Sequence, residues 1–190
     1  AAGRCAGDPL RHGGQADGLG LQVFVADIAG GLWRGYDVCS DRERIAIFAA
    51  ESNDAWNTDV RNKILGVGSF SQVDLFRVDG ANPIPTLTDL QRYSAVLVYS
   101  DGVGFNNNIN MGNVLADYVD QGGGVVVGTF AFYDSGGISI QGRLVSGGYL
   151  PFTTAGQSSG SHLTLIKDLP LHAICSNVGS FGGGTASYHN

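Results

Sequence analysis

The sequence predicts an α/β fold built around a parallel sheet. The clearest evidence is the segment LADYVDQGGGVVVGTFAF at 115–132, where an amphipathic helix runs into three glycines and then into a strand. The three consecutive valines at 125–127 are typical of a strand that helices cover on both faces. The helix places its apolar residues at the i, i+3, i+4, i+7, i+8 spacing of one stripe, namely at Met111, Val114, Leu115, Tyr118 and Val119.

A βαβ unit precedes this segment. RIAIFAA at 44–50 is the expected first strand, a helix is expected over 54–65, and QVDLFRV at 72–78 is the expected second strand. Three residues can cap this helix, Ser52, Asn53 and Asp54. The i+4 spacing predicts that it buries Trp56, Val60 and Ile64.

A third strand follows a short helical turn at 87–93. The strand is AVLVYS at 95–100, and the loop DGVGFNNNIN then leads into the helix already described, which Asn108 or Asn110 can cap. Right-handed crossovers place the four strands in the order 2-1-3-4, a flavodoxin-like parallel sheet with helices on both faces. Beyond Phe132, glycine-rich turns between short apolar pieces predict an irregular, β-rich C-terminal part.

The expected domain boundaries follow from changes in residue composition and in the regularity of the hydrophobic pattern. Residues 1–42 form an N-terminal extension that can add one strand to the sheet or act as a linker, and 43–190 form the α/β domain, which can continue beyond the last residue. Cys5 and Cys39 could form a disulfide that leaves Cys175 free, or all three thiols could be reduced.

Composition excludes some classes of partner. The net charge is -6 and basic residues do not cluster, so no nucleic-acid partner is expected. Apolar runs are far shorter than the roughly 20 residues that span a membrane. Only 15% of residues are charged while 30 are glycine, a composition more common in secreted proteins than in cytosolic ones.

Candidate ligand-binding residues lie where the strands end. Ligands of open parallel sheets bind beyond the carboxyl ends of the strands, near the point where the strand order reverses. Glu51, Asp54 and Asp101 are expected at one rim, where a carboxylate pair could perform acid/base chemistry or hold a cation, or could simply cap helices. Ser100 ends the third strand beside them.

Aromatic residues follow the same strands. Trp56, Phe105, Phe130 and Tyr133 could line one cleft and stack on a sugar ring, or could be ordinary packing residues. A small polar molecule or a carbohydrate is therefore the expected ligand.

Several segments resemble the class I glutamine-amidotransferase-like superfamily, in particular its trehalose-utilisation-type (ThuA-like) branch and related secreted bacterial domains. The matching segments are NDAWNTDVRNKIL, YSAVLVYSD, GNVLADYVDQGGGVVVGTFAF and LHAICSNVGSFGGGTASYHN. The resemblance implies an amidotransferase-like fold, in which catalytic members carry a nucleophilic cysteine on a tight turn after the strand that here is GVVVGTF.

This chain departs from that pattern at the turn. Its residues there are Thr129, Phe130 and Ala131, without a cysteine or serine, so amidotransferase chemistry is not expected. Thr129 could act as a nucleophile only with an adjacent base, and a β-branched residue ending a buried strand is more often structural.

Other candidate groups carry weaker signals. His172 and Cys175 in the segment HAIC could form a catalytic pair, although their apolar neighbours favour a core position for the thiol. The histidines lack metal-binding spacing, so no metal site is predicted. Phosphate-loop motifs are incomplete, and although a flavin could bind at DGVGFNNN, no cofactor is predicted.

These observations lead to one hypothesis and two alternatives. The leading hypothesis is a non-catalytic or catalytically altered amidotransferase-like domain that binds a small polar ligand or a partner at the strand ends. A hydrolase acting on an ester, amide or carbohydrate-related substrate is the first alternative, with Asp101, Thr129, His172 and Cys175 as candidate catalytic residues. A structural module of a larger surface protein is the second. The sequence leaves the oligomeric state open.

Overall fold

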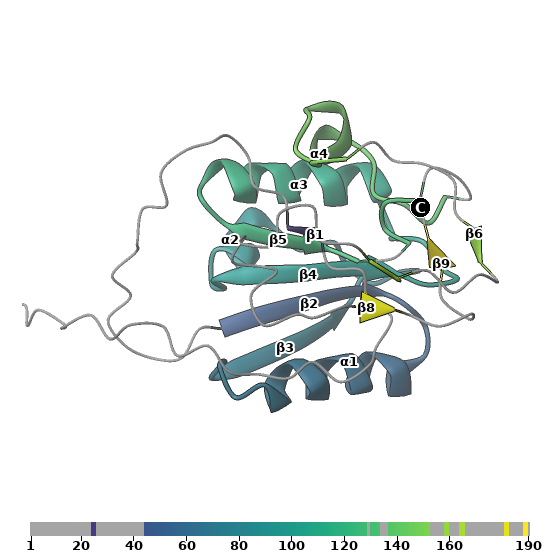
Figure 1. Ribbon diagram of the computed structural model, residues 1–190. Coiled ribbons are helices and arrows are strands. Elements are labelled where there is room, and N and C mark those ends of the chain that lie inside the picture. The colour runs from purple at the N-terminus through teal and green to yellow at the C-terminus, as the bar shows by residue number, and fades with distance from the viewer. Residues whose placement is uncertain are drawn as a thin grey trace, which may run out of the picture. The chain divides into compact units, whose positions relative to one another are not determined.

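The computed structural model describes residues 44–128, 130–133 and 137–152, together with the backbone of five two-residue strands. The chain divides into two compact units. The larger contains 41–157 and the stretch 22–31, and the smaller contains 158–189 with two stretches from the N-terminal region. The larger unit carries the parallel sheet (Figure 1).

Four parallel strands form the centre of the larger unit. They are β2 (Arg44–Ala50), β3 (Gln72–Arg77), β4 (Ala95–Ser100) and β5 (Gly124–Val127). β2 pairs with both β3 and β4, and β4 pairs with β5, so the spatial order is β3-β2-β4-β5. This is the predicted order 2-1-3-4, and the α/β flavodoxin-like fold class is confirmed. A short strand, β1 (Phe24–Val25), pairs antiparallel with β5 at its free side.

One helix covers the first face of the sheet. This helix, α1 (Asp54–Gly66), packs beside β3, and its Asn57 bonds to Tyr99 of β4. Since side chains alternate along a strand, the odd-numbered residues of β2, β3 and β4 face α1. The buried apolar residues on this face include Ile45, Ile47, Val73 and Leu97.

The packing of α1 corrects the sequence prediction by one residue. Trp56 is 58% exposed, whereas its neighbour Asn57 is fully buried. The inward stripe consists of Asn57 with the half-buried Val60, Arg61 and Ile64. The apolar spacing pointed to Trp56, but a polar side chain is needed at 57 because the helix begins over the polar ends of the strands.

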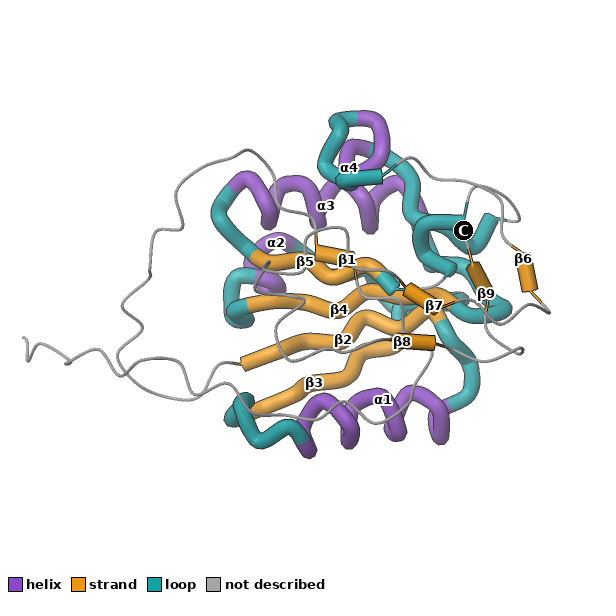
Figure 2. Tube along the Cα trace, in the orientation of Figure 1, coloured by secondary structure: helices purple, strands orange, loops and turns teal. Residues whose placement is uncertain are grey.

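The opposite face of the sheet carries the main core. The even-numbered residues Ala46, Phe48, Val96 and Val98 belong to one buried cluster. This cluster also contains Met111, Leu115 and other residues of α3 (Asn108–Asp120), and Leu90 of α2 (Leu87–Leu90). α1 therefore lies on one face and α2 and α3 lie on the other, as Figure 2 shows.

Close backbone packing fixes the segment after β5 against α3. Gly112 lies so near the chain that an added Cβ would be 1.7 Å from the Gln141 carbonyl oxygen. The Asn108 amide donates to the Gly137 and Ser139 carbonyls at 2.7 and 2.6 Å. α3 is capped by Asn107, whose side chain accepts from the Asn110 N–H, so neither Asn108 nor Asn110 is the cap.

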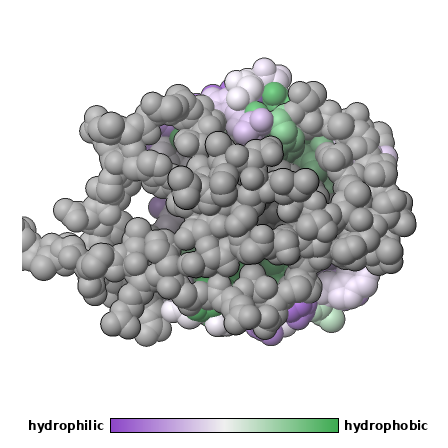
Figure 3. Space-filling view, in the orientation of Figure 1, coloured by the Kyte–Doolittle hydropathy of each residue, from purple (hydrophilic) through white to green (hydrophobic). Residues whose placement is uncertain are grey.

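A short helix, α4 (Arg143–Ser146), follows this segment and packs on α3. The Arg143 guanidinium bonds to Asp120 at 2.6 Å and to Asp117. Hydrophilic and hydrophobic colours both appear at the top and at the bottom of the space-filling view (Figure 3).

Among the described strands, β3 is the last on its side of the sheet, and α1 contacts its outer edge directly. The Val78 N–H donates to the Ala49 carbonyl of β2, so by alternation the peptide groups of Val73 point away from β2. Arg61 of α1 donates from Nε to the Val73 carbonyl oxygen at 2.7 Å. One outward acceptor of the edge strand is thus occupied by a side chain of the same chain.

The smaller unit contains two pairs of short antiparallel strands. β6 (Ser158–Ser159) pairs with β9 (Tyr188–His189), and β7 (Thr164–Leu165) pairs with β8 (Phe181–Gly182). None of the helices in the described ranges is long and apolar enough to cross a membrane.

Candidate functional site

The candidate site lies where β2 and β4 end side by side. Ala50 is paired with Ser100, and the Asp101 N–H donates to the Ala50 carbonyl at 3.0 Å. The next residues along the two strands are therefore Glu51 and Asp101. β2 and β4 are the first and third parallel strands, and the reversal of strand order between them is where open α/β sheets bind ligands.

Glu51 is 4% exposed and supports the start of α1. Its Oε1 accepts from the Asn53 N–H at 2.5 Å. Asn53 is the N-cap, and its Oδ1 accepts from the backbone N–H groups of Ala55 and Trp56 at 3.0 and 3.3 Å. Of the three predicted caps, Asn53 performs the role, and Glu51 holds it in place.

Asn57 joins the helix to both strands beneath the carboxylates. Its Nδ2 donates to the Glu51 carbonyl at 2.9 Å, and its Oδ1 accepts from the Tyr99 hydroxyl at 2.6 Å. Burial, with the charges of Glu51 and Asp101, raises the Tyr99 pKa, so the hydroxyl remains protonated as the donor. The amide group therefore satisfies one polar group from each strand.

Asp101 is partly exposed and coupled to Glu51. Burial raises the pKa of its carboxyl, and the negative charge of Glu51 raises it further. Neither carboxylate has a basic partner in the part of the chain that the structure describes. The ion pairs there instead involve Asp54, Asp59, Asp74, Asp79, Asp117 and Asp120.

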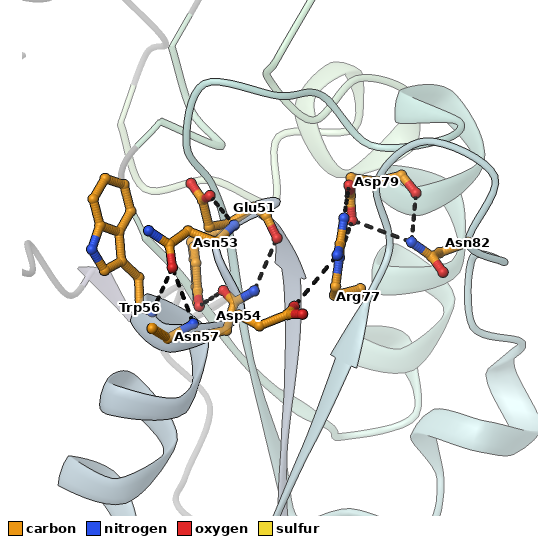
Figure 4. A network of polar contacts seen from close by, with 10 residues as sticks. Glu51, Asn53, Asp54, Trp56, Asn57, Arg77, Asp79 and Asn82 are labelled. Atoms are coloured by element: carbon orange, nitrogen blue, oxygen red, sulfur yellow. Dashed lines mark hydrogen bonds and ion pairs between the residues drawn. The ribbon is translucent and has the colours of Figure 1, made fainter.

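Asp54 belongs to a separate network of ion pairs and hydrogen bonds. Arg77 bonds to both oxygens of Asp79, at 3.0 and 2.6 Å, and reaches Asp54 at 3.4 Å (Figure 4). Asn82 donates to Asp79 at 3.3 Å. Arg77 keeps the pKa of Asp79 below its ordinary value. Of the three carboxylates predicted at one rim, the structure thus couples Glu51 with Asp101, while Asp54 is paired with Arg77.

The loop after β4 is tied to the end of β3. Asp79 and Phe105 form an antiparallel bridge, and Asn106 donates from its N–H to the Val78 carbonyl at 2.7 Å and from Nδ2 to the Asn82 carbonyl at 3.0 Å. Phe105 is 5% exposed within the core cluster. It acts as the anchor of this loop and leaves the rim to polar side chains.

The remaining predicted ligand-binding residues lie in different surroundings. Ser100 is fully buried, and its hydroxyl makes no hydrogen bond to any of the described residues. Phe130 and Tyr133 are partly buried in the turn after β5, where the Phe130 N–H donates to the Ser100 carbonyl at 3.2 Å. The candidate catalytic residues Thr129, His172 and Cys175 lie outside the described residues.

Sequence reasoning missed Asn57 and Tyr99 as parts of the site. The signal was available, because Asn57 lies four residues after the cap Asn53, on the inward stripe of a helix that begins at a strand end. An asparagine in that position needs polar partners, which only the strand ends could supply.

No group of three or more metal-binding side chains occurs among the described residues. What the arrangement can do chemically is to accept hydrogen bonds from a ligand or exchange a proton through Asp101. A scan against models of protein families finds no match, and searches of curated proteins and of solved structures find no significant one.

Proposed function

We propose that this domain is a catalytically altered relative of the amidotransferase-like superfamily that binds a small polar ligand at the ends of β2 and β4. The observation that carries the proposal is the coupled pair Glu51 and Asp101, which lies at the switch point without a basic partner in the described residues. Placing two carboxylates together costs free energy, which a ligand that donates hydrogen bonds can offset.

The turn after β5 supports a binding role over amidotransferase chemistry. The sequence Gly128, Thr129, Phe130, Ala131 offers no thiol, and backbone bonds from Gly128 to Val98 at 2.7 Å and from Phe130 to Ser100 at 3.2 Å tie the turn to β4. A turn of this sequence lacks the cysteine that amidotransferase chemistry requires, which supports a binding role for the strand ends.

Calorimetric titration of the full chain with a panel of sugars, polyols, amines and amino acids tests the proposal. Asp101→Asn and Glu51→Gln keep the shape of each side chain and remove its charge, so binding should weaken at least about tenfold. Asp59→Asn is the matched control, because Asp59 lies on the exposed side of α1 and pairs with Lys63. Equal affinity in all three variants would refute the site.

A hydrolase is the second candidate, favoured by the raised pKa of Asp101 next to a second carboxylate. A carboxyl group whose pKa is raised by burial and by a neighbouring carboxylate is better suited to protonate a leaving group than an ordinary one. Chromogenic esters, amides and glycosides are the test, with Asp101→Asn, His172→Ala and Cys175→Ala compared with the wild type. Turnover that only Asp101→Asn abolishes would replace the binding role with catalysis at this pair.

A further inference from the structure

Trp56 places its apolar indole ring near the polar carboxyl ends of the parallel strands. The side chain is 58% exposed and makes no aromatic or cation–π contact within the described ranges. An exposed indole offers a flat apolar face, and covering that face with a ligand removes apolar surface from water, which is favourable. Its position is set by the helix register, which turns the neighbouring Asn57 inward and Trp56 outward.

The polar groups beside the ring offer both kinds of hydrogen-bonding function. Figure 4 shows the Asn53 amide between the Trp56 ring and the Glu51 carboxylate. Asn53 uses its Oδ1 for the cap, while its Nδ2 makes no hydrogen bond within the described part of the chain. A free donor, a carboxylate acceptor and a flat apolar face therefore occur side by side.

We propose that Trp56 and Asn53 form a subsite for a neutral sugar ring, an inference that rests on the proposed function and names its ligand class. The apolar face of the sugar stacks on the indole. One ring hydroxyl accepts from Asn53 Nδ2, and another donates to Glu51.

Charge and hydrogen bonding select this class over the alternatives. Glu51 and Asp101 repel an anionic ligand such as a sugar phosphate or a nucleotide. An ammonium ion would be attracted to the carboxylates and to the indole, but it has no acceptor for Asn53 Nδ2. A sugar hydroxyl both donates and accepts, so it satisfies the amide and the carboxylate together.

The test is calorimetric titration of the full chain with methyl β-D-glucopyranoside and cellobiose, up to roughly 100 mM. Tetramethylammonium chloride and adenosine are the competing probes. Trp56→Leu removes the ring and should weaken sugar binding roughly tenfold, while Trp56→Phe should have a smaller effect. Ile109→Ala is the matched control, because Ile109 is similarly exposed, at 60%, in the first turn of α3. The Ile109→Ala variant should bind the sugar with the affinity of the wild type.

Fluorescence gives a second readout. The chain has two tryptophans, so Trp33→Phe leaves Trp56 as the single indole emitter. Sugar should shift or quench that emission, and Asn53→Asp, which keeps the cap and removes the donor, should weaken the response.

The outcomes separate this inference from the proposed function. Sugar binding that Asp101→Asn weakens and Trp56→Leu leaves unchanged would overturn the Trp56 subsite and leave the strand-end site intact. Binding of tetramethylammonium or adenosine without sugar would overturn the sugar class. Absence of any sugar response would likewise overturn the inference, while the wider ligand panel decides the proposed function separately.

Discussion

Asn57 is the residue on which the hydrogen bonds at the carboxyl ends of β2 and β4 depend most directly. It is fully buried, and its amide satisfies the Glu51 carbonyl just after β2 and the Tyr99 hydroxyl of β4. A buried polar group that loses its partner costs the full desolvation penalty, so both partners depend on this side chain.

Asn57→Leu should lower the free energy of unfolding by about 2–4 kcal/mol, because it leaves two buried polar groups unpaired. Urea unfolding followed by circular dichroism measures the change. Asn62→Leu on the exposed side of the same helix is the control and should change stability by at most about 0.5 kcal/mol. Equal effects of the two substitutions would show that the amide contacts contribute little.

Asp101 should make stability depend on pH in a direction opposite to most carboxylates. Its pKa in the folded chain is raised above the ordinary value of 3.8, so between the two values the native state holds more protons than the unfolded chain. Its contribution to stability is therefore lost as pH rises through that window, and above it the charged carboxylate opposes folding.

The comparison of Asp101→Asn with the wild type isolates this effect. The variant should gain stability relative to the wild type at pH 7, and the gain should shrink as pH falls below the window. Urea midpoints measured from pH 3 to 8 provide the check. Asp59→Asn, which removes an exposed pair with Lys63, should show no such gain, and a pH-independent gain in Asp101→Asn would contradict the assignment.

At the scale of elements, the two helical glycines lie in opposite environments. A Cβ on Gly112 in α3 would clash with the Gln141 carbonyl oxygen, whereas one on Gly66 at the end of α1 would meet nothing within 4 Å. Gly112 therefore permits the close approach of the chain after β5 to α3, and Gly66 has no such role.

Gly112→Ala should destabilise the protein by about 1–3 kcal/mol, because backbone must move to admit the methyl group. Gly66→Ala is the matched substitution and should stabilise it by up to about 1 kcal/mol through higher helix propensity. Thermal unfolding of the two variants gives opposite shifts in melting temperature on this view. A stabilising Gly112→Ala would show that the loop and helix separate easily.

The positions of the helices along the chain could be predicted from the sequence. Which residue of α1 faces the sheet, and which residue caps α3, could not. The i, i+3, i+4 spacing located α1 and α3 to within a few residues, yet it assigned Trp56 inward because apolar residues usually lie inside. Asn57 takes that place because strand ends carry polar groups that need partners. The cap of α3 was missed by one residue, since Asn107 and Asn108 look alike in sequence and only backbone geometry separates them.

At the scale of the whole molecule, the strand order was predictable because right-handed crossovers leave few alternatives. The neighbouring ends of β2 and β4 followed from that order, and with them the pairing of Glu51 with Asp101. The ion pair of Asp54 with Arg77 could not be predicted in the same way. Arg77 ends a different strand, β3, and a long side chain can reach several neighbours. The local sequence pattern therefore predicts the order of the strands more readily than it predicts which side chains pair.

Hydrogen exchange should follow the strand order. All but the first residue of β2 and of β4 are buried, whereas every residue of β3 except Val73 is partly or fully exposed. Amides of 45–50 and 96–100 should therefore exchange slowest, and those of 72–77 clearly faster. Mass spectrometry of peptides from native-state exchange tests this order. Protection of β3 equal to that of β2 would mean that the outer edge of β3 is covered in solution.

The Arg61 contact with Val73 has a consequence for how copies of this chain behave in concentrated solution. An unoccupied strand edge can template the strand of another molecule and begin intermolecular polymerisation. A foreign strand approaching β3 would have to displace a guanidinium from the carbonyl oxygen that it holds at 2.7 Å, and would gain a hydrogen bond only after breaking one. At this one position of β3, Arg61 therefore opposes the addition of a strand from a second molecule.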